Sequence, residues 1–222
     1  MGRIGLVAGH TFLGAEAELA AFESDDVVVL QRHGLERYAP PHLIDHRANL
    51  TRLADAGCDR VLAVSSVGSL RTELEVGATV CPDDFIALHL GYSVFGDARG
   101  HRVVGFDAAW RKRVLAGWTS REPGTRDRGV YWQAIGPRFE TPAEIRLIAG
   151  HADVIGMTVA SECIVASELG IAYAAICVVD NLANGIGTEP LTVAEYEAGR
   201  AANRARTRET LEAVLPSLVD PA

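Results

Sequence analysis

An aromatic ring beside a carboxylate, followed by a hydroxyl further along the chain, is the most distinctive chemical combination in this sequence. Phe139 and Glu140 come directly after a Gly-Pro-Arg turn, and Thr158 ends a short apolar stretch. An aromatic face can stack on a heterocyclic base, a carboxylate can accept hydrogen bonds from ring N–H groups, and a hydroxyl can donate to an anion. A surface turn followed by a core strand explains this stretch equally well.

Anion-binding side chains follow three apolar stretches in the first third of the chain. They are Thr11 after the first stretch, Arg32 and His33 after the second, and Ser65 and Ser66 after the third. Backbone N–H groups and a hydroxyl can converge on an anion, an arginine can grip two phosphate oxygens, and a histidine can donate a further hydrogen bond. Each group alone also fits an ordinary turn. The carboxyl ends of the strands in an open α/β sheet lie on one side. The presence of anion-binding residues after all three stretches therefore favours a single anion site.

Two further polar residues are candidates for ligand contact. Asn181 follows a strongly apolar stretch, and its amide offers both a donor and an acceptor to a heterocycle edge that presents both. A simple Asn-rich turn is the alternative. His101 lies in the poorly patterned region 83–106, and loops of that length often serve function or subunit contacts.

Alternating buried strands and helices must position these residues. Apolar stretches predict strands at 4–8, 27–31, 61–64, 129–135, 152–158 and 171–179. Helical patterns predict helices at 43–56, 108–118, 142–149, 159–169 and 193–218. This alternation predicts an α/β fold.

Composition limits the classes of partner. A chain of 222 residues with 48% hydrophobic content is long enough for one well-buried domain, and we expect a single domain over residues 1–222. The formal net charge of -8 argues against nucleic acid and against an anionic membrane, since both need a basic face. A small anion remains compatible, because a few arginines can converge locally.

The cysteines indicate a reducing compartment. Cys58, Cys81, Cys163 and Cys177 are far apart, and their spacing matches no metal or redox motif, so we expect four buried thiols and no metal. Residues 1–9 read as a strand and not as a secretory signal. No apolar stretch reaches the roughly 18 to 20 residues that span a bilayer. We therefore expect a cytoplasmic protein without membrane partners.

Taken in order, these segments resemble the trimeric purine nucleoside phosphorylase family, which also contains 5'-methylthioadenosine and 5'-methylthioinosine phosphorylases. The similarity spans nearly the whole chain and covers 9–11, 32–34, 41, 48–49, 68–71, 136–141, 157–158, 162 and 181. The resemblance implies a single domain with a mixed central β-sheet flanked by helices. It also implies a homotrimer that needs no cofactor, with phosphate as a co-substrate.

The resemblance implies a role for each candidate residue. Phosphate binding falls on Thr11, Arg32, His33, Ser65, Ser66 and Thr158, and catalysis on Asn181, Glu140 and His33. Substrate binding falls on Phe139, Glu140, Met157, Asn181, Val193, Tyr196 and His101, where Met157 packs against the sugar and His101 is a candidate contact across a subunit border.

The two base-reading residues indicate a 6-oxopurine. Glu140 can accept from N1–H, which a 6-oxopurine carries and neutral adenine lacks. Asn181 can donate to N7 or O6 and stabilise the negative charge that builds on the purine as the glycosidic bond breaks.

Three departures from the family pattern concern the rest of the site. Arg37 stands where relatives often have a histidine, and Ser65-Ser66-Val67-Gly68 replaces their usual strand end. No histidine follows His151, so the C-terminal helix cannot supply the histidine that some relatives use on a sugar 5'-hydroxyl. Val193 and Tyr196 are there instead, which predicts a more apolar 5' pocket suited to a methylthio group.

The predicted function is phosphate-dependent cleavage of 6-oxopurine nucleosides to the free base and a pentose 1-phosphate. Candidate substrates are inosine, guanosine and S-methyl-5'-thioinosine, within purine salvage. The alternatives are a 5'-methylthioadenosine phosphorylase, a nucleoside hydrolase that uses water, and a binding protein without turnover. Arg32 and His33 argue against the hydrolase, since a water nucleophile needs no anion site. Gly9 and Gly14 are wrongly spaced for a dinucleotide-binding oxidoreductase.

Overall fold

A mixed β-sheet lies at the centre of the computed structural model, which describes residues 2–35, 37–188 and 190–219. The strands are β1 (Arg3–Ala8), β2 (Val27–Gln31), β3 (Cys58–Ser69), β4 (Thr79–Cys81), β5 (Asp84–Ile86), β6 (Arg126–Asp127), β7 (Val130–Gln133), β8 (Val154–Gly156) and β9 (Ala172–Leu182). Their order is β5-β7-β8-β3-β9-β4-β6, and β1 pairs with both β2 and β3. Only the β3/β8 and β4/β9 pairs are antiparallel among the described strands. The predicted α/β fold with a mixed central sheet is confirmed.

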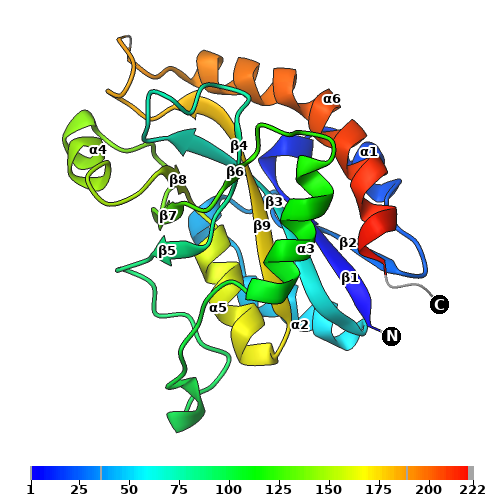
Figure 1. Cartoon of the computed structure of the whole chain (residues 1–222). Coiled ribbons are helices and arrows are strands. Elements are labelled where there is room, and N and C mark those ends of the chain that lie inside the picture. The colour runs from blue at the N-terminus through cyan, green and yellow to red at the C-terminus, as the bar shows by residue number, and fades with distance from the viewer. Residues whose placement is uncertain (1, 36, 189, 220–222) are drawn as a thin grey trace.

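Helices cover both faces of this sheet (Figure 1). They are α1 (Glu16–Ala20), α2 (His46–Asp55), α3 (Ala108–Thr119), α4 (Pro142–Ile148), α5 (Val159–Leu169) and α6 (Val193–Leu218). On one face, α2 and α5 bury residues such as Leu53 and Cys163. On the other face, α1, α3 and α6 bury residues such as Trp118 and Leu211. Two apolar layers therefore enclose the sheet, while α4 packs on a smaller cluster of its own around Ile145.

Two central strands extend beyond their predicted ends. The predicted strand 61–64 is part of β3, whose parallel pairing with β9 continues as far as Ser69 opposite Leu182. Ser65 and Ser66 therefore lie within β3, and Asn181 lies within β9. Small polar residues have low strand propensity, but the hydrogen-bond ladder between two buried neighbours overrides that preference.

Side-chain caps set several helix boundaries. The predicted helix 43–56 begins only at His46, because Pro41–Leu43 forms a short 3-10 helix and the Asp45 side chain accepts from the Ala48 N–H. At the start of α6, Thr192 and Glu195 form a reciprocal capping box. The apolar pattern and the composition do not indicate this cap.

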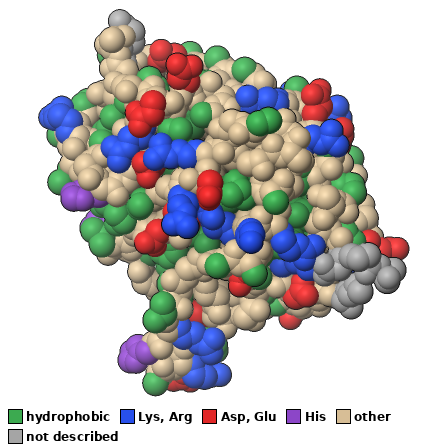
Figure 2. All heavy atoms as spheres, viewed as in Figure 1, with side chains coloured by type: hydrophobic (Ala, Val, Ile, Leu, Met, Phe, Trp, Pro, Cys, Tyr) green, Lys and Arg blue, Asp and Glu red, His purple; other side chains and the backbone are tan. Residues whose placement is uncertain are grey.

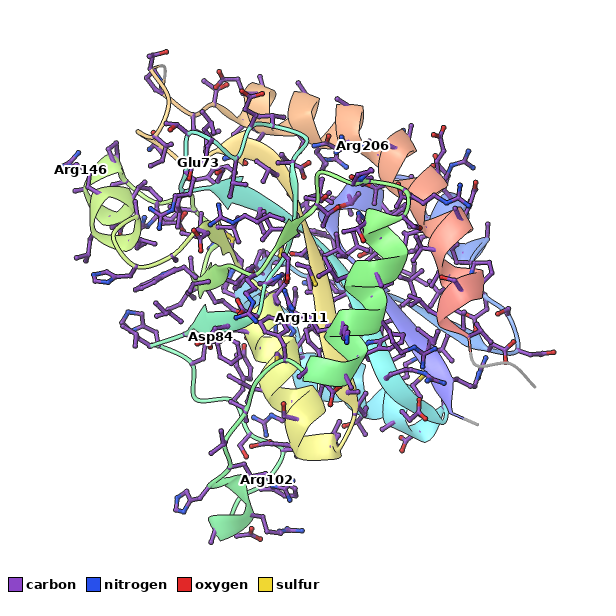
Figure 3. The ribbon with its side chains drawn as sticks, viewed as in Figure 1. Glu73, Asp84, Arg102, Arg111, Arg146 and Arg206 are labelled. Atoms are coloured by element: carbon purple, nitrogen blue, oxygen red, sulfur yellow. The ribbon has the colours of Figure 1, made fainter. Side chains whose placement is uncertain are left out.

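A long irregular segment joins β5 to α3 and extends away from the body of the molecule (Figure 1). A 3-10 helix at Ala98–Gly100 is its main regular part. Arg102, labelled in Figure 3, lies on this extension. The Val94 N–H donates to the buried carboxylate of Glu168 on α5 and so fastens the base of the segment.

The four cysteines are buried and free, as predicted. Within the described part of the chain, no helix could cross a bilayer and no group of side chains could hold a metal ion. Acidic and basic side chains are interspersed on the face shown in Figure 2. Several of the arginines are paired, including Arg71 and Arg126, which both contact Asp153.

Candidate active site

One pocket opens where β1, β2, β3 and β9 reach their carboxyl ends, beside the first residues of α5 and α6. It brings together Arg32, His33, Ser65, Ser66, Phe139, Glu140, Met157, Thr158, Asn181, Val193 and Tyr196, all of which the sequence predicted as site residues. Thr11 and His101 do not line it. Residues from strands that are distant in sequence converge here because parallel strands end at the same edge.

Phe139 and Glu140 form one end of the pocket. The Phe139 ring is 36% exposed and meets the Tyr196 ring edge to face, with centroids 5.4 Å apart. Burial raises the pKa of the Glu140 carboxyl above its usual value. The backbone carbonyl of Glu140 accepts a hydrogen bond of 3.0 Å from Nδ2 of Asn184, which fixes the turn against the end of β9. This end offers an aromatic face and an acceptor.

Asn181 is 6% exposed and also lines this end. Its Nδ2 donates to the Leu182 carbonyl at 2.8 Å, which leaves one N–H and the amide oxygen for a ligand. Gly68 lies opposite Asn181 in the β3/β9 pairing, and a Cβ there would come within 3.2 Å of Nδ2. A glycine at this position therefore gives Asn181 room in the strand.

Met157 lines the pocket and packs against Gly136. This glycine has a positive φ of 70°, and a Cβ on it would lie 2.5 Å from the Met157 sulfur. A side chain at this position would therefore displace Met157, which explains the glycine on both steric and conformational grounds.

Arg32 is buried at the other end, and its guanidinium is already engaged. Nε and Nη2 donate to the two carboxylate oxygens of Glu162 at 2.6 and 2.8 Å, and Nη1 donates to the Val64 carbonyl at 3.0 Å. Glu162 therefore occupies the Nε/Nη2 edge of the guanidinium, and the predicted grip on two phosphate oxygens stays a prediction for the other edge. One N–H on each Nη remains for an anion.

Charge pairing keeps both partners ionised. Burial by itself disfavours both charges, yet Glu162 holds the pKa of Arg32 above its usual value and Arg32 holds the pKa of Glu162 below its usual value. Tyr173 adds a hydrogen bond of 2.7 Å to the Glu162 carboxylate. This end of the pocket therefore carries little net charge from the pair.

His33 presents an acceptor to the pocket instead of the predicted donor. Its Nδ1 lies 2.8 Å from the Ala39 carbonyl, and since a carbonyl only accepts, Nδ1 carries the proton. Burial, followed by the nearby His10, lowers the pKa of His33 to about 3, so the ring is neutral. Nε2 is then unprotonated and can accept a hydrogen bond from a protonated phosphate oxygen.

Thr158 is the N-cap of α5, and its side chain makes no hydrogen bond to the helix. The hydroxyl is therefore available to a ligand in the pocket that Thr158 lines. The Thr158 and Val159 N–H groups donate to the Tyr131 hydroxyl and the Ser161 N–H donates to Oε1 of Gln133, so the N-terminus of α5 favours an anion beside it mainly through its positive dipole end.

Two predicted residues are placed outside the pocket. Thr11 lies in the 3-10 helix His10–Phe12 and is 1% exposed, and its hydroxyl has no hydrogen-bond partner among the described residues. His101 is exposed on the segment that extends from the body, so within one chain it is remote from the pocket. Its predicted contact across a subunit border stays a prediction.

The pocket is also lined by polar residues that the sequence did not predict, among them His10, Tyr38 and Asn184. His10 belongs to the Gly-His-Thr loop in which the sequence predicts a role for Thr11. The polar character of His10 and its place after a buried strand are the signals that point to it. Tyr38 and Asn184 lie in irregular segments, where no periodicity indicates which side chains turn inward.

Comparison with known proteins identifies the family. A family model described as the phosphorylase superfamily matches residues 8–216. The chain belongs to this superfamily. The resemblance seen in the sequence is thereby confirmed, and this phosphorylase has close curated relatives.

Two relatives are named as acting on 6-oxopurine nucleosides. A probable 6-oxopurine nucleoside phosphorylase of Archaeoglobus fulgidus is 39% identical over 183 residues, which are 82% of this chain and 75% of the relative. A protein of the same name from Dictyoglomus turgidum is 36% identical, over 89% of this chain and 78% of its own. A probable S-methyl-5'-thioinosine phosphorylase of Methanocaldococcus jannaschii is 35% identical, over 81% of this chain and 73% of its own.

Solved structures show the same fold. The methylthioadenosine phosphorylase from Schistosoma mansoni in complex with adenine superposes with a TM-score of 0.83, over all of this chain and 93% of that one. Its sequence identity of 22% makes this a likeness of fold.

Proposed function

We propose that this phosphorylase cleaves the N-glycosidic bond of 6-oxopurine nucleosides with phosphate, giving the free purine and a pentose 1-phosphate. The observation that carries the proposal is the arrangement of one pocket. An aromatic ring, a carboxylate and an amide line one end, and an arginine, a neutral histidine and a helix N-terminus line the other. The relatives named for 6-oxopurine nucleosides and S-methyl-5'-thioinosine support the same substrate class.

The base is read at the end formed by Phe139, Glu140 and Asn181. Phe139 stacks on the purine, and the Glu140 carboxylate accepts from N1–H of a 6-oxopurine. The unprotonated N1 of adenine would instead face the carboxylate with a lone pair. The remaining N–H of Asn181 donates to N7 or O6 and stabilises the charge that the departing base acquires.

Phosphate is the nucleophile at the other end. One phosphate oxygen forms a bond to the anomeric carbon while the glycosidic C–N bond breaks and its electron pair stays on the purine. The proton of monohydrogen phosphate ends on the base, so the atoms and charges balance. Before reaction, the free Nε2 of His33 accepts a hydrogen bond from the hydroxyl of monohydrogen phosphate. Thr158 and the remaining Arg32 N–H groups hold the other phosphate oxygens. Positioning of phosphate against the sugar supplies much of the rate.

The test is a product assay on the purified full chain. Inosine, S-methyl-5'-thioinosine and methylthioadenosine are each incubated with and without phosphate, and base release is followed by chromatography. We expect phosphate-dependent release of hypoxanthine and little release of adenine. Base release at an equal rate without phosphate would show a hydrolase instead, and tight hypoxanthine binding without turnover would show a binding protein.

The family resemblance extends the proposal to the working enzyme. It predicts a homotrimer in the cytoplasm, acting in purine salvage without a cofactor or metal. In such a trimer the exposed His101 is the candidate to reach a neighbouring site. Sedimentation of the full chain tests the oligomeric state directly.

A further inference from the structure

A row of aromatic rings runs along one wall of the pocket. The His33 and His10 rings are 4.4 Å apart, His10 and Tyr196 are 6.0 Å apart, and Tyr196 and Phe139 are 5.4 Å apart, all between centroids. Because His33 lies at the phosphate end and Phe139 at the base end, this row spans the distance that a nucleoside must bridge. The sugar of a bound nucleoside therefore lies along it.

The stereochemistry of a nucleoside decides which part of the sugar meets His10 and Tyr196. In a β-nucleoside the base and the exocyclic C5' project from the same face of the sugar, and phosphate attacks the opposite face. Tyr196, near the start of α6, lies beside the ring that stacks on the base, and Val193, one turn earlier on the same helix, also lines the pocket. They therefore cover the face from which C5' projects, and His10 approaches Tyr196 on that side.

His10 brings a polar group to this region from the opposite end of the chain. The Tyr38 hydroxyl lies 3.1 Å from Nε2 of His10, and the Tyr38 ring stacks on His33 with centroids 5.1 Å apart. Among the described residues, Nδ1 of His10 has no hydrogen-bond partner. Burial, followed by the charge of Arg200, lowers the pKa of His10 to about 4, so the ring offers one donor and one acceptor.

We propose that the His10–Tyr38 pair binds the 5'-hydroxyl of the nucleoside and makes this phosphorylase favour a 5'-hydroxyl over a 5'-methylthio group. A hydroxyl both donates and accepts, and it can satisfy either tautomer of His10. A thioether sulfur accepts only weakly and leaves the pair unsatisfied, which a polar site penalises. The apolar 5' pocket predicted from the sequence rests on residues of the C-terminal helix, whereas this histidine follows the end of β1.

This inference rests on the proposed function, and substrate pairs test it separately. Inosine is compared with 5'-deoxyinosine and S-methyl-5'-thioinosine, at saturating phosphate, in the wild type and in Tyr38→Phe and His10→Phe. Tyr38→Phe keeps the ring on His33 and removes only the hydroxyl. We expect the wild type to favour inosine over 5'-deoxyinosine in kcat/KM by about 10-fold, the worth of a lost hydrogen bond in a polar site.

Both variants should lower that ratio to near one, while kcat/KM for 5'-deoxyinosine and KM for phosphate stay within about 2-fold. Equal losses on inosine and 5'-deoxyinosine, or a rise in KM for phosphate alone, would place the pair at another group and overturn the inference. Thermal unfolding checks that each variant is folded. If His10→Phe does not fold, the result for Tyr38→Phe decides the test. Absence of phosphate-dependent cleavage of every substrate by the wild type would instead reject the proposed function itself.

Discussion

At the scale of single residues, Glu140 has the most demanding role in the proposed reaction. Its carboxylate is a strong acceptor for a purine N1–H only while it is ionised. Burial raises the pKa of this carboxyl, so the charge is lost at a higher pH than in an exposed glutamate. Base recognition and the pH dependence of activity should therefore share one origin.

We expect kcat/KM for inosine to fall as the pH drops through the raised pKa of Glu140. Below that pH the carboxyl is neutral and its acceptor strength is lost, whereas above it the full rate is reached. A pH profile of kcat/KM measures this acidic limb. Glu140→Gln has no charge to lose, so a limb at the same pH in that variant would contradict the assignment.

Glu140→Ala should lower kcat/KM for inosine by about 10- to 100-fold, because a hydrogen bond to a charged group is worth roughly 1.5–3 kcal/mol. Steady-state kinetics with inosine and phosphate measures the loss. Arg138→Ala is the matched control, since Arg138 is two residues away, exposed and paired with Glu144 outside the pocket. A similar loss in both variants would mean that the turn is disturbed and not the base contact.

At the scale of elements, the Arg32–Glu162 pair joins the loop after β2 to α5. Both side chains are almost fully buried, and Tyr173 on β9 also donates to Glu162. The pair therefore fixes three elements around the phosphate end of the pocket. Its stabilising effect depends on both partners, because either charge alone would be buried without compensation.

Glu162→Gln should lower the free energy of unfolding by about 3–5 kcal/mol, the usual cost of breaking a buried pair from one side. Urea denaturation of the wild type and the variant measures the change. Glu212→Gln is the control, since its partner Arg208 forms an exposed pair on α6 and little change is expected. Equal stability of wild type and Glu162→Gln would show that the arginine finds other partners.

The capping box at the start of α6 holds Val193 and Tyr196 at the pocket. Thr192→Ala should cost about 1 kcal/mol of stability, because the first turn loses its side-chain cap. We also expect KM for the nucleoside to rise by about 2- to 5-fold with KM for phosphate unchanged, since about 1 kcal/mol corresponds to that range. Thr192→Ser retains the cap and should behave as the wild type. An unchanged nucleoside KM in Thr192→Ala would show that the cap does not position the pocket residues of α6.

At the scale of the whole molecule, three histidines are buried in neutral form around the pocket and beneath it. Burial is the largest cause that lowers the pKa of His10 and of His46 to about 4 and that of His33 to about 3. In the unfolded chain these groups titrate at the ordinary histidine pKa of 6.5. Between these values the unfolded chain binds more protons than the folded protein does.

Stability should therefore be full above pH 6.5 and fall as the pH drops below that value. At pH 5.5 each histidine contributes a loss of about 1.4 kcal/mol in the free energy of unfolding. The raised pKa values of Glu140 and Asp180 act in the opposite direction, nearer the ordinary range of carboxyls. Thermal unfolding between pH 7.5 and 5 measures the net effect. A constant midpoint over this range would mean that the histidines are hydrated in solution.

The sequence by itself determined the class of fold and most of the site. Apolar periodicity places strands and helices because a half-buried or buried element must repeat its apolar positions. Residues such as Phe139, Glu140 and Asn181 carry chemistry that is legible from type and position, and they line one pocket together. The sequence could predict which groups line the pocket where those groups follow strands or a recognisable turn.

Only the tertiary structure decided how those groups are used. Glu162 lies 130 residues from Arg32, and its occupation of the guanidinium fork depends on packing between distant elements. The proton position on His33 depends on the Ala39 carbonyl, and the place of His10 beside Tyr196 depends on how β1 and α6 meet. Local patterns reflect burial and secondary structure, whereas hydrogen-bond partners and pocket walls arise from contacts between segments that the sequence keeps far apart.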